Sequence, residues 1–147
     1  MLGAAEALAG MREWSEPVVF DCLHDSYAHR LDNAAQAGAL AHRHAQQWRA
    51  LIAGDTQRFE TLRREFVAAL ADDGFDGGCL IEADVRVLAE LYEITMARFG
   101  RRARIADAYR EALREIAARL APVSRAVAPQ SAAHSAFASL RPRAMSA

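Results

Sequence analysis

Lysine is absent from this 147-residue sequence, and all 18 basic residues are arginine. They are balanced by 19 acidic residues, so the net charge at pH 7 is -1. A nucleic-acid-binding domain normally carries a strongly basic face, and this balance therefore argues against a nucleic-acid partner. The densest basic group lies where one predicted helix ends and the next begins, where exposed arginines are expected; it comprises Arg98, Arg101, Arg102 and Arg104.

Cysteine and long apolar runs are also scarce. Cys22 and Cys79 are too few and too far apart to form a disulfide framework or a zinc site, so we expect reduced thiols. No apolar run approaches the roughly 18 residues of a membrane-spanning helix. The opening residues, MLGAAEALAGMREW, lack the basic segment of a secretory signal. We therefore expect a soluble, cytoplasmic protein with no membrane contact.

Runs of β-branched and aromatic residues, which are typical of strands, are nearly missing, since only VVF at 18–20 has this character. Apolar residues instead recur every three or four positions through most of the chain, which is the spacing of amphipathic helices. A chain of 147 residues can remove roughly two-thirds of its surface from water as one domain, without disulfide or metal support. The sequence therefore predicts a single all-α domain.

Capping residues indicate where the first two helices begin and end. Ser15 followed by Pro17 is typical of a helix start, so we expect the first helix to begin at Ser15. A second helix is predicted over residues 34–53, and Gly54 is expected to end it.

The later helices are also expected to end at glycine or proline. The third is capped by Asp55 or Thr56 and is predicted to stop at Gly74. The fourth, over about residues 79–99, is apolar around a wide arc, which indicates deep burial. The fifth has a narrower apolar seam, which suits a partner helix as well as its own core, and is expected to stop at Pro122.

These boundaries divide the chain into three parts. Residues 1–14 are expected to form an N-terminal segment, and residues 15–121 the helical domain. Residues 122–147 are rich in Ala, Ser and Pro and have no apolar periodicity, so we expect them to form a flexible tail.

The stretch HRHAQQWRALIAGD, residues 42–55, raises the question of a bound metal or heme. His42 and His44 are two positions apart, about 200 degrees around a helix, so they cannot chelate one metal together. His44 and Trp48 are four apart and share the inward face, whereas His42 points to the polar side. The histidine pair is therefore not a metal motif.

Other arrangements that could carry chemistry are incomplete. The turn DDGFDGG at 72–78 matches part of a calcium loop, but Ala83 stands where that loop needs a bidentate carboxylate. Cys22 and His24 are close in sequence but fall on different helix faces, so they cannot act as nucleophile and base. We therefore predict neither a metal site nor an enzyme.

The chain carries three segments in a characteristic order: DSYAHRL at 25–31, HAQQWRALIAGD at 44–55, and GFDGGCLIEADVRVLAEL at 74–91. Together they resemble the globin domain of bacterial globin-coupled sensors, the protoglobin-related group. Those domains carry an early-helix Tyr, then a His-Trp or similar pair followed by Leu and Gly, then a Gly-Leu turn before a long apolar helix. The resemblance covers about residues 17–120 and implies a globin-like bundle of about five to six helices.

The resemblance also implies which residues line the family's cofactor pocket. Tyr27 matches the Tyr of the distal pocket, and the helix that bears His44 and Trp48 covers the same side. The axial heme ligand, a His about four residues before the Gly-Leu turn, corresponds to Leu70, and no His lies between His44 and His134. Heme iron needs a strong donor such as imidazole or thiolate. The resemblance therefore implies a pocket lined by Tyr27, His44, Trp48 and Leu70 that holds no cofactor.

The sequence thus favours a cofactor-free, globin-like sensor or regulatory domain in bacterial signal transduction. We expect it to act through contact with a signalling protein and to form a homodimer through its last two helices. Two alternatives remain open. One is a heme-based oxygen or redox sensor with an atypical ligand, His44 or Cys79, and the other is a small helical adaptor unrelated to globins.

Overall fold

Helices build the described part of the chain. The computed structural model describes residues 3–75 and 77–127, and every regular element within these ranges is a helix. They are α1 (Ala4–Ala28), α2 (Ala34–Ala53), α3 (Thr56–Asp72), α4 (Gly77–Phe99) and α5 (Ala103–Val127). The predicted all-α bundle of about five to six helices is confirmed.

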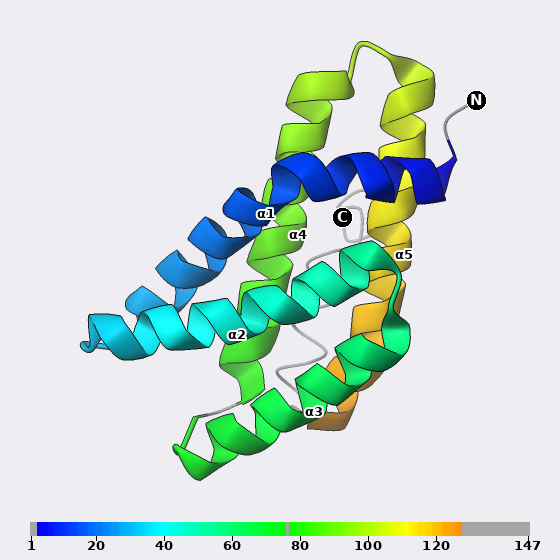
Figure 1. Ribbon diagram of the computed structural model, residues 1–147. Coiled ribbons are helices and arrows are strands. Elements are labelled where there is room, and N and C mark those ends of the chain that lie inside the picture. The colour runs from blue at the N-terminus through cyan, green and yellow to red at the C-terminus, as the bar shows by residue number, and fades with distance from the viewer. Residues whose placement is uncertain (1–2, 76, 128–147) are drawn as a thin grey trace, which may run out of the picture.

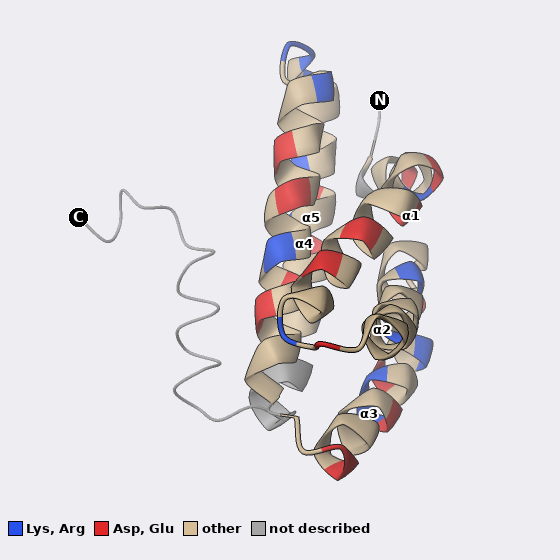
Figure 2. Cartoon of the chain, turned by 90° about the vertical axis from the view of Figure 1, so that its left-hand side faces the viewer, with Lys and Arg blue, Asp and Glu red and all other residues tan. Residues whose placement is uncertain are grey.

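The helices are arranged in two layers (Figures 1 and 2). α4 and α5 form an antiparallel pair, and α1 and α2 run across this pair instead of alongside it. α1 packs against α2, α4 and α5, while α3 follows α2 and also contacts α4 and α5. α5 therefore contacts each of the other four helices.

Local signals set the ends of α2 and α3 as the sequence predicted. α2 ends at Gly54, whose φ of 79° is a left-handed conformation that glycine adopts without strain. The side chain of Asp55 then accepts a hydrogen bond from the backbone N–H of Arg58 and so caps α3. Gly74, with a φ of 80°, lies just beyond the end of α3.

The prediction that the first helix begins at Ser15 is wrong. α1 begins at Ala4 and continues through Pro17, and Figure 1 shows that the helix bends along its length. The residues before Ser15 are rich in Ala, a strong helix former, and Ala7 and Met11 are fully buried. Burial of this first half stabilises the helix, and the missing N–H of Pro17 then costs one internal hydrogen bond without ending it.

The prediction that the fifth helix stops at Pro122 is also wrong, because α5 continues to Val127. Pro122 cannot donate to the carbonyl of Ala118, which lies four residues earlier. Ala118 is exposed, so water can hydrogen-bond that carbonyl instead. Most of the predicted tail, residues 128–147, lies outside the described residues.

The core is continuous and mainly apolar. Its largest fully buried side chains are Trp48, Tyr27, Phe59, Phe66, Met11, Leu23, Leu51, Leu70, Leu80, Ile81 and Leu91, and Arg63 is buried as completely as they are. A buried arginine needs compensating partners, so its surroundings identify the region where the fold departs from simple hydrophobic packing.

No helix within the described ranges is both long enough and apolar enough to cross a membrane.

Two glycines of the α2 region are expected to respond to alanine with opposite signs. A Cβ would meet open space at both Gly38 and Gly54, so only backbone conformation distinguishes them. Gly54→Ala should destabilise the protein by about 1 kcal/mol, because its positive φ disfavours a side chain. Gly38→Ala, inside α2, should stabilise it by roughly 0.5–1 kcal/mol. Urea denaturation of both variants measures the difference, and equal signs would contradict this account.

Candidate functional site

The carboxylate of Asp84 is the centre of a buried polar cluster that joins four helices. Asp84 lies on α4 and is 1% exposed. Its hydrogen-bond donors are His44 and Trp48 of α2 and Arg63 of α3, and His44 in turn contacts Tyr27 of α1. We call these five residues the Asp84 hub, and none of them is more than 2% exposed.

Arg63 binds the carboxylate with both terminal nitrogens. One guanidinium nitrogen lies 2.8 Å from Oδ2 of Asp84 and the other lies 3.2 Å from Oδ1. This two-pronged geometry fixes the relative orientation of the two side chains as well as neutralising their charges. The guanidinium also lies over the ring of Phe59, 5.0 Å from its centroid. α3 and α4 are therefore joined by a fully buried ion pair.

His44 connects the carboxylate to Tyr27. Its Nε2 lies 2.7 Å from Oδ1 of Asp84, and its Nδ1 lies 2.8 Å from the hydroxyl oxygen of Tyr27. A carboxylate can only accept, so Nε2 carries the proton and donates to Asp84. In the neutral ring Nδ1 then accepts from the Tyr27 hydroxyl. Both ring nitrogens of His44 are consequently engaged.

Trp48 supplies the remaining donor to Asp84. Its indole N–H lies 2.9 Å from Oδ1, and the whole side chain is fully buried. His44 and Trp48 are four residues apart on α2, so one helix face presents both donors to the same oxygen. This confirms that the two residues share the inward face, and His42 lies exposed as predicted.

The charges of the hub are strongly coupled. Burial alone would raise the pKa of Asp84, but the Arg63 guanidinium and the His44 ring together hold the pKa well below its usual range. Burial lowers the pKa of His44, although Asp84 acts in the opposite direction. The pKa of Tyr27 is raised by burial and by the charge of Asp84. The hub is therefore an Arg–Asp ion pair with neutral His and Tyr attached.

The structure brings together three of the four residues assigned to a cofactor pocket. Tyr27, His44 and Trp48 meet in the hub, where they bind one another or Asp84. Leu70 is 2% exposed on α3, two turns beyond Arg63, and contributes only hydrocarbon to the core. Its aliphatic side chain cannot ligate iron.

Arg63 and Asp84 were missed by the sequence analysis, although a signal for both is present. Arg63 stands four residues after Phe59 in the apolar stripe of α3, and Asp84 stands four residues after Leu80 in that of α4. Opposite charges at inward positions of two helices are expected to pair, because an unpaired buried charge is very costly. The register of the stripes could therefore have shown that both residues are inward charges that need a partner.

The hub offers little to a metal or a cofactor. The metal-binding lone pair of His44 is occupied by the Tyr27 hydroxyl, and the carboxylate of Asp84 is saturated by nitrogen donors. Among the described residues no group of three or more His, Cys, Asp or Glu side chains could hold a metal ion. Asp76, part of the incomplete calcium loop, lies outside these residues. The polar groups of the hub thus link α1, α2, α3 and α4 to one another.

Removing the charge of Asp84 should destabilise the fold strongly. Asp84→Asn leaves the Arg63 guanidinium buried without its counter-charge, and we expect a loss of about 3–5 kcal/mol in the free energy of unfolding. Glu82→Gln is the matched control, because Glu82 lies on the same helix in an exposed ion pair with Arg30; its effect should not exceed about 1 kcal/mol. Asp84→Leu should also leave Arg63 without its counter-charge. Adding Arg63→Met should recover part of the stability that Asp84→Leu loses, and a double variant no more stable than Asp84→Leu would contradict the charge-pairing explanation.

The stability of the protein should depend on pH through His44 and Asp84. Because the native pKa of His44 is lowered, the unfolded state takes up a proton first, and stability should fall as the pH drops below about 6.5. The lowered pKa of Asp84 should add a second loss below about pH 4. A glutamine in place of His44 can donate a hydrogen bond to Asp84 and accept one from Tyr27, and it has no proton to gain or lose in this pH range. In His44→Gln, the loss between about pH 6.5 and 5 should therefore disappear while the acid loss remains, as measured by urea denaturation across pH; an unchanged profile would show that His44 is not the titrating group.

No protein-family model matches the chain, and comparisons with curated proteins and with solved structures found no match. The geometry of the hub and of the surface is therefore the basis for a functional proposal.

Proposed function

We propose that this chain is a cofactor-free, globin-like helical sensor or regulatory domain that acts through protein contacts in bacterial signal transduction. The observation that carries the proposal is that Tyr27, His44 and Trp48 already use their polar groups within the Asp84 hub. The resemblance to globin-coupled sensors implies a heme beside Tyr27 and Trp48, yet these side chains use their polar groups on His44 and Asp84. The interior that a heme would need is thus used to hold helices together.

The hydrogen bonds of the hub also disfavour His44 as an atypical iron ligand. Iron coordination by Nδ1 would displace the Tyr27 hydroxyl, and coordination by Nε2 would remove a hydrogen bond from Asp84. Either change leaves a buried polar group without its partner, which costs about 1–3 kcal/mol or more for a charged group. A heme would have to offset that loss and also displace the fully buried side chains around it.

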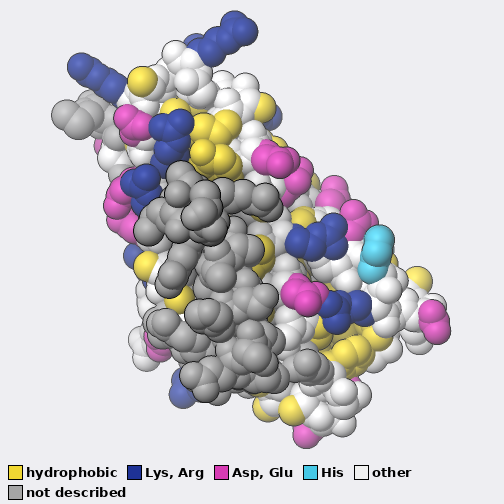
Figure 3. Space-filling view, turned by 180° about the vertical axis from the view of Figure 1, so that it is seen from behind, with side chains coloured by type: hydrophobic (Ala, Val, Ile, Leu, Met, Phe, Trp, Pro, Cys, Tyr) yellow, Lys and Arg dark blue, Asp and Glu magenta, His cyan; other side chains and the backbone are white. Residues whose placement is uncertain are grey.

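The surface of α4 offers a contact site for a second copy of the chain. Tyr92 is 48% exposed and is the only large hydrophobic side chain exposed to this degree among the described residues. Ala89 and Met96 lie three residues before it and four residues after it, so the three share one helix face. Figure 3, which views the molecule from behind, shows hydrophobic side chains gathered between charged ones. A homodimer through α4 and α5 would bury such a face.

Purification after expression with a heme supply tests the cofactor-free proposal. We expect no stoichiometric Soret band, because neither nitrogen of His44 is available to iron. His44→Ala and Cys79→Ala provide the comparison, since only the loss of a true ligand changes the absorption spectrum. A stoichiometric band that disappears in either variant would overturn the proposal in favour of a heme-based sensor.

Light scattering on the same material tests the contact surface. The unmodified chain should have the mass of a dimer, and Tyr92→Glu should shift it toward the monomer because it places a charge in the apolar contact. Glu93→Gln, at the neighbouring exposed position, is the control and should leave the dimer intact. A monomeric unmodified chain, or a dimer unaffected by Tyr92→Glu, would contradict an α4 interface.

A further inference from the structure

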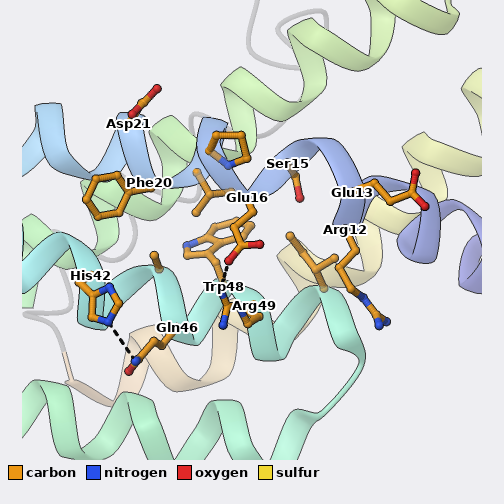
Figure 4. A pocket seen from close by; sticks show the side chains of 14 residues that line it. Arg12, Glu13, Ser15, Glu16, Phe20, Asp21, His42, Gln46, Trp48 and Arg49 are labelled. Carbon is orange, nitrogen blue, oxygen red and sulfur yellow. Dashed lines mark hydrogen bonds and ion pairs between the residues drawn. The ribbon is translucent and has the colours of Figure 1, made fainter.

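A groove of about 540 Å³ lies between the middle of α1, residues 12–21, and the second half of α2. Figure 4 shows it beside the bend of α1, with Trp48 in its wall. Small-molecule sites in proteins commonly enclose a few hundred cubic ångströms and combine an apolar lining with a few polar groups. The groove therefore has the size of a site for a small organic molecule.

Hydrocarbon lines the middle of the groove. Phe20 of α1 and Ala45 of α2 are partly exposed there, and Val19, Trp48 and Ile52 line it too but are at most 4% exposed. Phe20 is only half-buried, so its ring can contact a bound molecule. An aromatic or branched hydrocarbon body would bury its surface against this lining, at roughly 25 cal/mol per Å² of apolar area.

The charges around the groove leave one group available to a ligand. Glu16 and Arg49 form an ion pair across it and neutralise each other. Figure 4 shows that Glu13 and Asp21 point away from the space between the helices, whereas Arg12 extends from α1 toward α2 at one end. Among the described residues no acidic side chain pairs with Arg12. Its guanidinium can therefore receive a carboxylate.

We propose that this groove binds a small aryl-alkanoic acid, with its carboxylate on Arg12 and its hydrocarbon body against the apolar lining. A guanidinium at one end and an apolar middle favour an amphipathic anion over a neutral or cationic molecule of the same shape. Trp48 lines the groove and donates its N–H to Asp84, so the site directly adjoins the hub. The inference does not depend on the proposed function, because binding requires neither a partner nor a dimer.

Isothermal titration with 4-phenylbutyrate tests the proposal on the full chain, and 4-phenylbutanol and 4-phenylbutylamine provide isosteric controls of different charge. The acid should bind about tenfold or more tightly than the alcohol, and the amine should bind more weakly still. No binding of the acid, or equal binding of all three compounds, would overturn the proposal.

Two variants locate the binding site. Arg12→Gln should weaken the acid about tenfold and leave the alcohol unchanged, whereas Arg101→Gln, which removes an exposed arginine at the α4–α5 turn, should change neither. Ala45→Phe should fill the groove and abolish binding of the acid, with unchanged circular dichroism showing that the helices remain folded. Retained binding in Ala45→Phe, or an equal loss in both arginine variants, would place the ligand elsewhere and overturn the assignment.

Discussion

The carboxylate of Asp84 is the point on which the packing of four helices depends. α2 and α3 bind it directly through His44, Trp48 and Arg63, and α1 reaches it through Tyr27. A buried carboxylate is costly unless a counter-charge and hydrogen bonds surround it. Each helix must therefore have a fixed position along its axis and a fixed rotation about it for the carboxylate to receive these hydrogen bonds. The polar interior thus defines the arrangement of α1 to α4 more narrowly than hydrophobic contacts alone could.

α5 is held in a different way. Its inward side chains are hydrophobic, among them Tyr109, Ile116 and Leu120. The hydrogen bonds of the Asp84 hub come from residues of α1, α2, α3 and α4 and from none of the described side chains of α5. Apolar packing tolerates a rotation or a shift along the helix axis better than hydrogen bonds and a two-pronged ion pair between fixed partners do. Hydrogen bonds and a buried ion pair therefore fix the arrangement of α1 to α4, whereas α5 is held mainly by apolar packing. The buried ion pair itself joins α3 to α4 and involves no described side chain of α5.

The sequence predicted those features that depend on neighbouring residues. Gly54 ends α2 because its own backbone conformation requires glycine, and no distant contact changes that. The predicted helix start at Ser15 and the predicted helix end at Pro122 were wrong, because burial of apolar residues on the same helices outweighs a local cap or one lost hydrogen bond. The pairing of Arg63 with Asp84 depends on how α3 and α4 meet, and that is decided by the whole bundle. Inward charges were visible in the sequence, but their partners were not.

The position of Trp48 gives the molecule a built-in spectroscopic probe. The chain has only one other tryptophan, Trp14. It lies near the middle of α1, with the guanidinium of Arg98 over its ring. With Trp14 replaced by phenylalanine, all indole fluorescence would arise from one buried ring whose N–H faces a carboxylate. Its emission maximum would then report whether water reaches the interior. The opening of α2 from α4 could thus be followed in time without attaching a dye.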